Sequence, residues 1–389
     1  MRSAIFSSGF RASFLAAAAS ATLLVPLWVL IWGFGWSLET NWPPTLWHAH
    51  EMLFGFIAAA IAGFLLTAVP SWTGRRGFAG WPVGALSAAW VLARVLIASS
   101  AHWPVLLVAT VDVGFLISVG ALIAPPLLRA GNRNTPLLLV LGSLAACNAT
   151  FHWAVAHHDA EMARHSILVG IDISLLLVTV VGGRIVPAFT ANALRSTNSP
   201  AGIITLPFVT PAAILSVIAV VITDLFWADS RAAGLAAGIA AVINGARMLQ
   251  WRSLATWRQP IVWILHLGYV WLPVGLALKC LAALSGPAVS AFWLHSLTIG
   301  VLSTMIMAVM TRASLGHTGR ALVVDPAIAV AYLLLLAAAL TRVFGLSVLG
   351  LPYPFVIVIS ACCWTAAFAI FLTLYAPILW SPRVDGKPG

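Results

Sequence analysis

Long apolar runs alternate with short polar connections along the whole chain. Each run holds about 20 to 25 residues, which at about 1.5 Å per residue crosses a hydrocarbon core roughly 30 Å thick. The period-two alternation of barrel strands is missing, so the pattern predicts helices. We expect membrane spans at 12–35, 47–70, 81–99, 104–128, 135–157, 163–187, 206–226, 231–250, 260–284, 291–312, 326–346 and 353–379. The chain is therefore predicted to be an all-α polytopic membrane protein of about twelve helices, with one membrane domain over 1–389. We expect the tail from Ser381 to fray.

Composition agrees with this pattern. Hydrophobic residues make up 61% of the chain and charged residues only 8%, whereas about 25% of an ordinary soluble domain is charged. A soluble enzyme is therefore excluded, and membrane lipid is the expected surrounding. The four cysteines all fall inside apolar segments, so no disulfide framework is expected.

The net charge of +10 is unevenly placed along the chain. Most cations lie at one set of helix ends, and the opposite set holds only Arg164 and Arg231. The cation-rich set comprises Arg2, Arg11, Arg75, Arg76, Arg129, Arg133, Arg184, Arg195, Arg247, Arg252, Arg258, Arg312, Arg320, Arg383 and Lys387. By the positive-inside rule both termini are predicted to be cytoplasmic in an inner membrane. The cations thus indicate orientation, and no nucleic-acid partner is expected.

The chain also shows signs of an internal repeat. An offset of 245 residues aligns His50 with His295. The same offset aligns Gly55 with Gly300 and residues 73–75 with residues 318–320. A weaker copy aligns His165 with His295 at an offset of 130. We therefore expect three pseudo-repeats of four helices, at 1–130, 131–255 and 256–389. In each repeat the second helix carries a histidine in its first turn, on the predicted periplasmic side.

The second span opens with two imidazoles and a carboxylate within one turn, at His48, His50 and Glu51. Haem iron or another metal would give a buried imidazole a partner. Residues two apart on a helix diverge by about 200°, so the two histidines face different sides. One is a candidate haem ligand, and the other is a candidate for a second centre or a haem propionate. Glu51 is a candidate catalytic residue, because it could orient His48 or carry protons. The alternative is an interfacial cluster that reaches water.

His295 is the expected partner of a second-span histidine, because bis-imidazole haem b needs ligands from two facing helices. His165 is the third equivalent, with Asp172 on nearly the same face, although the polar residues just before it suggest a solvated loop instead. His266 and His317 are expected toward the cytoplasm. They could form a second metal site with Met310 or Tyr269; alternatively, both are structural histidines that make hydrogen bonds. For His102 and His152, interfacial placement is favoured.

Five charges are predicted to be buried in the spans: Arg94, Asp112, Asp172, Lys279 and Arg342. Each should have a partner or line a hydrated path. Arg94 and Arg342 fall at similar points in the third helices of the first and last repeats. We expect them to bind haem propionates or acidic side chains, with simple membrane topology as the alternative.

Three long motifs resemble the NnrS family: His48 to Phe56 with its continuation Ala62 to Gly74, Leu265 to Leu272, and Ala308 to Arg320. That resemblance covers almost the whole chain. It implies a bacterial twelve-helix membrane protein that contains haem and copper and is linked to the response to nitric oxide. A looser similarity is to the haem–copper oxidases, which also have twelve helices in three pseudo-repeats and haem-ligating histidines on helices 2 and 10.

Two differences from the oxidases concern copper. The His-x-His pair lies on the second span, and the seventh span has no histidine, although the oxidases take copper ligands there. Copper in this chain would need other ligands, from His48, His152 or His165, or from the pair His266 and His317.

The leading hypothesis is a haem protein that binds or reduces nitric oxide, with His50 or His48 and His295 as haem ligands. A reductase would also need electrons from quinol or a cytochrome, and protons through Glu51. The alternative is a non-enzymatic haem or copper carrier, sensor or transporter, since repeats and buried charges are equally typical of transporters.

Overall fold

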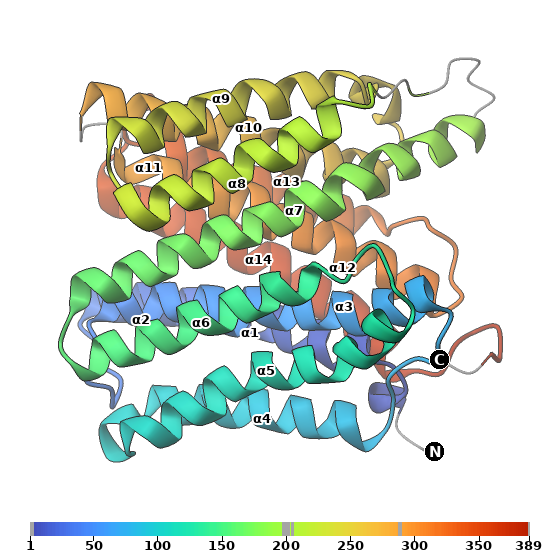
Figure 1. Ribbon diagram of the computed structural model, residues 1–389, viewed down its shortest axis with the longest axis horizontal. Coiled ribbons are helices and arrows are strands. Elements are labelled where there is room, and N and C mark those ends of the chain that lie inside the picture. Colours follow the sequence, from blue (N-terminus) through green and yellow to red (C-terminus); the bar gives the residue numbers. More distant parts are fainter. Residues whose placement is uncertain (1–3, 197–202, 204–205, 287–289, 388–389) are drawn as a thin grey trace. The chain divides into compact units, whose positions relative to one another are not determined.

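The computed structural model describes residues 4–196, 203, 206–286 and 290–387. Every regular element in these residues is a helix (Figure 1), and twelve helical stretches are long and apolar enough to cross a membrane. The main elements are α1 (Gly9–Phe34), α2 (Pro44–His50), η2 (Glu51–Ile57), α3 (Ala58–Thr73), α4 (Trp81–Ala98), α5 (Val105–Arg129), α6 (Leu137–Ala156), α7 (Ala160–Ser196), α8 (Val209–Trp227), α9 (Arg231–Leu249), α10 (Pro260–Ser285), α11 (Ser290–His295), η5 (Ser296–Ser303), α12 (Thr304–His317), α13 (Pro326–Phe344) and α14 (Tyr353–Trp380). Short 3₁₀ turns lie at Ala4–Phe6, Ser100–His102 and Ser253–Thr256. The prediction of an all-α protein with twelve spans is confirmed.

The helices form two compact units. The first unit comprises Met1–Gly170, Met310–Leu322 and Trp364–Gly389, and the second comprises Ile171–Val309 and Val323–Cys363. These boundaries differ from those of the predicted four-helix repeats. The threefold repeat stays a prediction.

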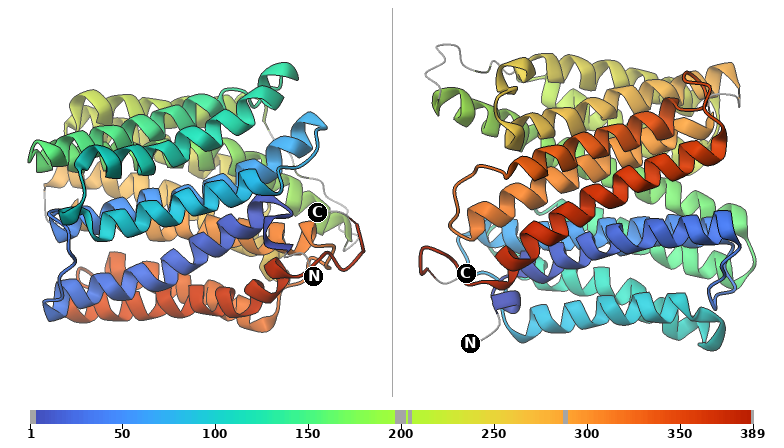
Figure 2. Two further views of the ribbon diagram at one scale, coloured as in Figure 1. Left: turned by 90° about the horizontal axis from the view of Figure 1, so that it is seen from below. Right: turned by 180° about the vertical axis from the view of Figure 1, so that it is seen from behind.

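In the first unit, α1 packs against α3 and η2, and α5 packs against α4 and α6. The C-terminal part of α14 lies beside α1 (Figure 2), where the Trp364 indole donates a hydrogen bond of 2.8 Å to the carbonyl of Ala21. The buried Arg11 donates to the carbonyls of Leu379 at 2.8 Å and Ser381 at 2.6 Å. A cation at this position satisfies carbonyls that a helix end leaves without intrahelical partners. The first and last spans are thus joined at one end.

The tail after α14 docks on the end of α12. Val384 donates its backbone N–H to the carbonyl of Thr318 at 3.1 Å, and Arg383 donates to the carbonyl of His317 at 2.8 Å. The expectation that the tail from Ser381 to Gly389 frays is wrong at Arg383 and Val384, which these polar contacts hold against the bundle. Pro388 and Gly389 lie outside the described residues.

In the second unit, α10 packs against α9 and η5, and α8 packs against α9. Gly300 lies in η5, where an added Cβ would approach Trp271 to 2.5 Å. A larger residue at position 300 would therefore push η5 away from α10.

The second and tenth spans share an unusual local structure. In each, an α-helix ends at a histidine, His50 or His295, and a π-helical segment, η2 or η5, follows at once. In η5 a side chain also donates a hydrogen bond to a backbone carbonyl of the widened turns. The Ser303 hydroxyl donates to the carbonyl of Thr298, five residues earlier, at 2.9 Å. π-Helical turns are rare and occur often at functional sites. The 245-residue offset thus aligns two histidines in the same local structure, whereas α7 continues as an α-helix past His165.

Candidate metal centre

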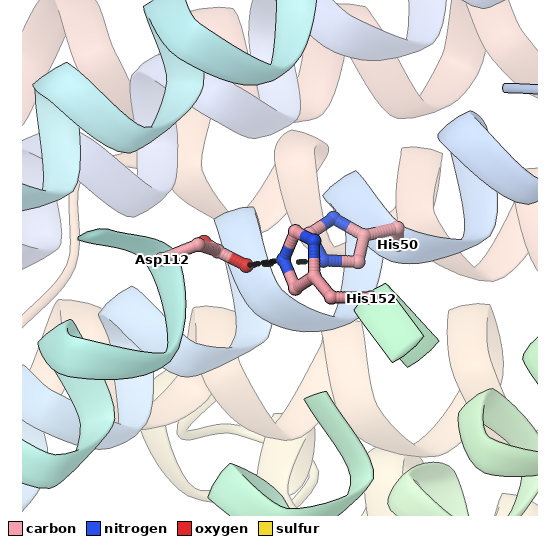
Figure 3. A group of neighbouring side chains, drawn as sticks. All are labelled: His50, Asp112 and His152. Atoms are coloured by element: carbon pink, nitrogen blue, oxygen red, sulfur yellow. Dashed lines mark hydrogen bonds and ion pairs between the residues drawn. The ribbon is translucent and has the colours of Figure 1, made fainter. Parts of the chain in front are cut away.

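Three buried side chains of the first unit point toward one another: His50, Asp112 and His152 (Figure 3). The Nε2 atoms of His50 and His152 lie 3.1 and 3.0 Å from the same Asp112 oxygen, Oδ2. All three residues are at most 3% exposed. Their ligand atoms lie within 4.8 Å of one another, so one ion could contact all three.

Three different helices supply these side chains. His50 is the last residue of α2, Asp112 lies early in α5, and His152 lies late in α6. Because α5 and α6 are packed together and joined by a short connection, the start of one lies beside the end of the other. The antiparallel pairing therefore brings Asp112 and His152 to the same level as His50.

A second layer of polar side chains surrounds the three. Arg94 of α4 donates to Glu51 at 2.7 Å and also binds the second oxygen of Asp112. Asn148, one turn before His152 on α6, donates to Asp112 at 2.8 Å. Gly55 makes room for Arg94, because a Cβ at this position would lie 3.0 Å from the guanidinium. The sequence expectation that Arg94 binds acidic side chains agrees with these contacts.

The His50 ring faces oxygen atoms on both sides. Its Nδ1 lies 3.3 Å from Glu51, and its Nε2 lies 3.0 Å from the Asn148 amide oxygen and 3.1 Å from Asp112. When both ring nitrogens carry protons, each donates to an acceptor. When Nε2 instead contacts an ion, Nδ1–H still donates to Glu51, which is the arrangement that commonly orients metal-binding histidines. A proton and a metal ion therefore compete for the same nitrogen.

The formal charges of the cluster do not balance. Asp112 and Glu51 contribute two negative charges, and Arg94 contributes one positive charge. Leaving a net charge inside a membrane protein is costly. One further positive charge, from a proton on His50 or from a bound cation, makes the cluster neutral.

The residues fit a metal ion on geometry and chemistry. Ligands about 2.0–2.1 Å from a tetrahedral ion are about 3.3–3.4 Å apart, close to the observed separations of 3.0 and 3.1 Å. Two imidazoles and a carboxylate suit copper, zinc or iron(II). The Trp42 ring contacts both imidazoles edge-on, with ring centroids 5.0 Å apart for His50 and 5.5 Å apart for His152. It gives the site an apolar cover.

The other predicted site residues have different surroundings. His48 stacks on Trp28 of α1 at 4.7 Å, consistent with the expected divergence from His50. His266 hydrogen-bonds to Thr190 at 2.7 Å and to Ser253 at 2.9 Å, as the structural alternative for this residue expects. His165 and His295 are half-buried in α7 and at the end of α11.

The two remaining residues of that set lie at helix ends. His317 is the last residue of α12, and its ring packs against Phe10 with the two ring centroids 5.6 Å apart. Arg342 donates to the Tyr353 hydroxyl at 3.3 Å. Haem ligation by His48, His50 or His295, a metal site at His266 and His317, and propionate binding by Arg342 stay predictions.

Sequence reasoning missed Asp112, which was expected to have a partner or line a hydrated path. His152 was named among the possible copper ligands, although interfacial placement was favoured for it. Asn148 and His152 are four residues apart in an apolar helix, which puts two polar side chains on one helical face. That spacing is a signal that could have identified α6 as a contributor.

Comparison with known proteins adds the family. No curated protein matches the chain. The family model described as "NnrS protein" matches residues 4–383, which is nearly the whole chain. The chain therefore belongs to the NnrS family.

Proposed function

We propose that this protein is a haem- and copper-containing protein of the bacterial inner membrane that binds or reduces nitric oxide. The observation that carries the proposal is the buried cluster of His50, Asp112 and His152, whose side chains fit a metal ion and whose charges leave room for one more positive charge. Family membership supports the link to nitric oxide through the resemblance described above.

Each residue of the cluster has a distinct role in this proposal. His50, His152 and Asp112 hold the ion, Glu51 orients the His50 ring, and Arg94 pairs with both carboxylates and offsets one of their two charges. Copper supplies a redox-active centre with affinity for nitric oxide. We favour copper over zinc because copper is redox-active, and because its monovalent form brings the single positive charge that makes the cluster neutral.

The proposed haem ligands follow from what His50 already contacts. Both His50 ring nitrogens lie against side chains of the cluster, so haem ligation by this residue would break those contacts. We therefore assign the haem b ligand of the second span to His48 and keep His295 as the other ligand. Electrons would come from quinol or a cytochrome, and Glu51 remains the candidate for carrying protons.

The orientation in the proposal follows the distribution of cations. Both termini lie in the cytoplasm, and the metal cluster lies toward the periplasmic side. Nitric oxide is small and weakly polar, so it partitions into the bilayer and reaches the cluster from lipid.

Metal analysis and optical spectra of the detergent-purified full chain test this proposal. We expect copper and a haem Soret band in the unaltered protein. His152→Ala should lose copper and keep the haem spectrum, whereas His48→Ala and His295→Ala should alter the haem spectrum and keep copper. His102→Ala is the matched control, because His102 is exposed and pairs with the exposed Glu39. Protein made with haem and copper available that contains neither would refute the proposal.

A carrier is the second candidate function. The competition between a proton and an ion at His50 suits reversible loading, which a carrier requires and a permanent redox centre does not. Consumption of nitric oxide by the reduced protein without oxygen would favour the reductase. Release of copper on mild acidification, without nitric oxide consumption, would favour the carrier.

A further inference from the structure

A second cluster of buried charges lies in the second unit, apart from the residues assigned above. It consists of Asp172 of α7, Asp224 of α8 and Lys279 of α10, each at most 8% exposed. The Lys279 ammonium binds Asp224 directly and lies 3.9 Å from Asp172. The Trp293 ring covers Lys279 at 4.8 Å. Water is therefore largely excluded from the three side chains.

The cluster holds two carboxyl groups and only one cation. Both carboxyl groups approach the same Lys279 ammonium, so they also lie close to each other. Ionised carboxylates only accept hydrogen bonds, so a hydrogen bond between two carboxyl groups requires a proton on one of them. Like charges held this close in a buried site do not both stay ionised, as two carboxylates that share one proton illustrate.

Among the described residues, Lys279 is the cation that pairs with Asp172 and Asp224. The cations of α9 are Arg231 and Arg247. Arg231 is exposed, and Arg247 donates hydrogen bonds to the Thr179 carbonyl and the Tyr269 hydroxyl. α11 carries the Trp293 ring and ends at the half-buried His295.

We propose that Asp172 and Asp224 together bind one exchangeable proton inside the membrane domain. A proton from water adds to one carboxylate oxygen, the second carboxylate accepts its hydrogen bond, and the cluster changes from one net negative charge to neutral. Release returns the proton to water. This inference is independent of the proposed nitric oxide chemistry, because it concerns different residues in the second unit.

Infrared spectroscopy of the full chain in detergent, in H₂O and D₂O, tests the proposal. The unaltered protein should show a carboxylic-acid C=O band near neutral pH that shifts in D₂O. Asp172→Asn and Asp224→Asn should each abolish this band, because the remaining carboxylate and Lys279 already balance. Asp325→Asn is the control, since Asp325 is an exposed residue that caps α13 and should leave the band unchanged.

Charge counting makes two further variants informative. Lys279→Met leaves two carboxyl groups without a cation, so a second proton should bind and the band should roughly double. Adding Asp224→Asn to Lys279→Met leaves one carboxyl group and should restore the original band. These variants decide the question even if one of the single aspartate variants does not fold.

Three outcomes would overturn the proposal. Absence of the band from the unaltered protein would mean that no proton is shared. Survival of the band in Asp224→Asn would mean that Asp172 is protonated without its partner. Loss of the band on adding NaCl at constant pH would identify a sodium ion as the balancing charge.

Discussion

Replacing Glu51 by Gln tests whether the carboxylate orients His50 for metal binding. The substitution keeps the size of the side chain and an acceptor oxygen but removes its charge. Glu51 Oε1 lies 3.3 Å from His50 Nδ1. An ion on Nε2 would lie roughly 7 Å from this oxygen, where two unit charges attract by about 2 kcal/mol at an effective dielectric constant of about 20. The glutamine oxygen still accepts a hydrogen bond from Nδ1–H, so the lost charge is the main change.

We therefore expect copper affinity to fall by about 10–100-fold, as is typical when a group that orients a metal ligand is replaced. This corresponds to about 1.4–2.7 kcal/mol. Competition with a chromophoric copper chelator, on purified protein in detergent, measures the change. His152→Ala removes a ligand and should weaken binding further, whereas His102→Gln should have no effect. Equal affinities for Glu51→Gln and the unaltered protein would refute the assigned role of Glu51. Full affinity in His152→Ala would refute the site itself.

Three further substitutions test the packing around the site and at the chain ends. Gly55→Ala should destabilise the protein in detergent by about 1–3 kcal/mol, because the new methyl group would lie 3.0 Å from the half-buried Arg94 guanidinium. Gly142→Ala, with open space around it, is the control and should be neutral or slightly stabilising. Arg11→Met should lower the unfolding free energy by about 1.5–3 kcal/mol, since it leaves helix-end carbonyls without their charged donor; an unchanged unfolding midpoint in denaturant would contradict this. Hydrogen bonds from Arg383 hold the pKa of the Asp385 carboxyl well below its ordinary value. Their stabilisation of the docked tail is therefore complete above about pH 3.9 and is lost as the pH falls through the lowered value. Asp385→Asn should release the tail at neutral pH, seen as faster proteolysis after residue 381, and equal cleavage rates would count against this contact.

The membrane spans could be predicted from the sequence because each one depends only on the length and apolarity of its own segment. An apolar run of sufficient length predicts a helix without reference to any other part of the chain. Thus the spans beginning at Trp81 and Arg231 are predicted to within one residue at each end. The tail from Ser381 was mispredicted because its order depends on contacts with α12 that no local pattern encodes.

The candidate site could be predicted only in part, for a related reason. His50 and Glu51 were identified because both lie in one short motif, whereas Asp112 and His152 join them through the packing of separate helices. The contact between His50 and Glu51 was also unexpected, because adjacent residues on an α-helix point in different directions. Here a π-helical segment begins at Glu51 and changes those directions. Sequence spacing alone therefore assigned Glu51 to His48.

The π-helical segment η2 also suggests a single mutation that would remove the metal site and keep the membrane span. A π-turn bonds residues five apart where an α-turn bonds residues four apart, so it accommodates one more residue. Deleting a single residue within Glu51–Ile57 would let the span revert to a continuous α-helix while both of its ends keep their places. The side chains between those ends would point in new directions, Glu51 and Gly55 among them. A one-residue deletion is therefore expected to leave a protein that inserts and folds but no longer orients His50, and single-residue length changes at this point offer the chain a short route to gaining or losing the metal cluster.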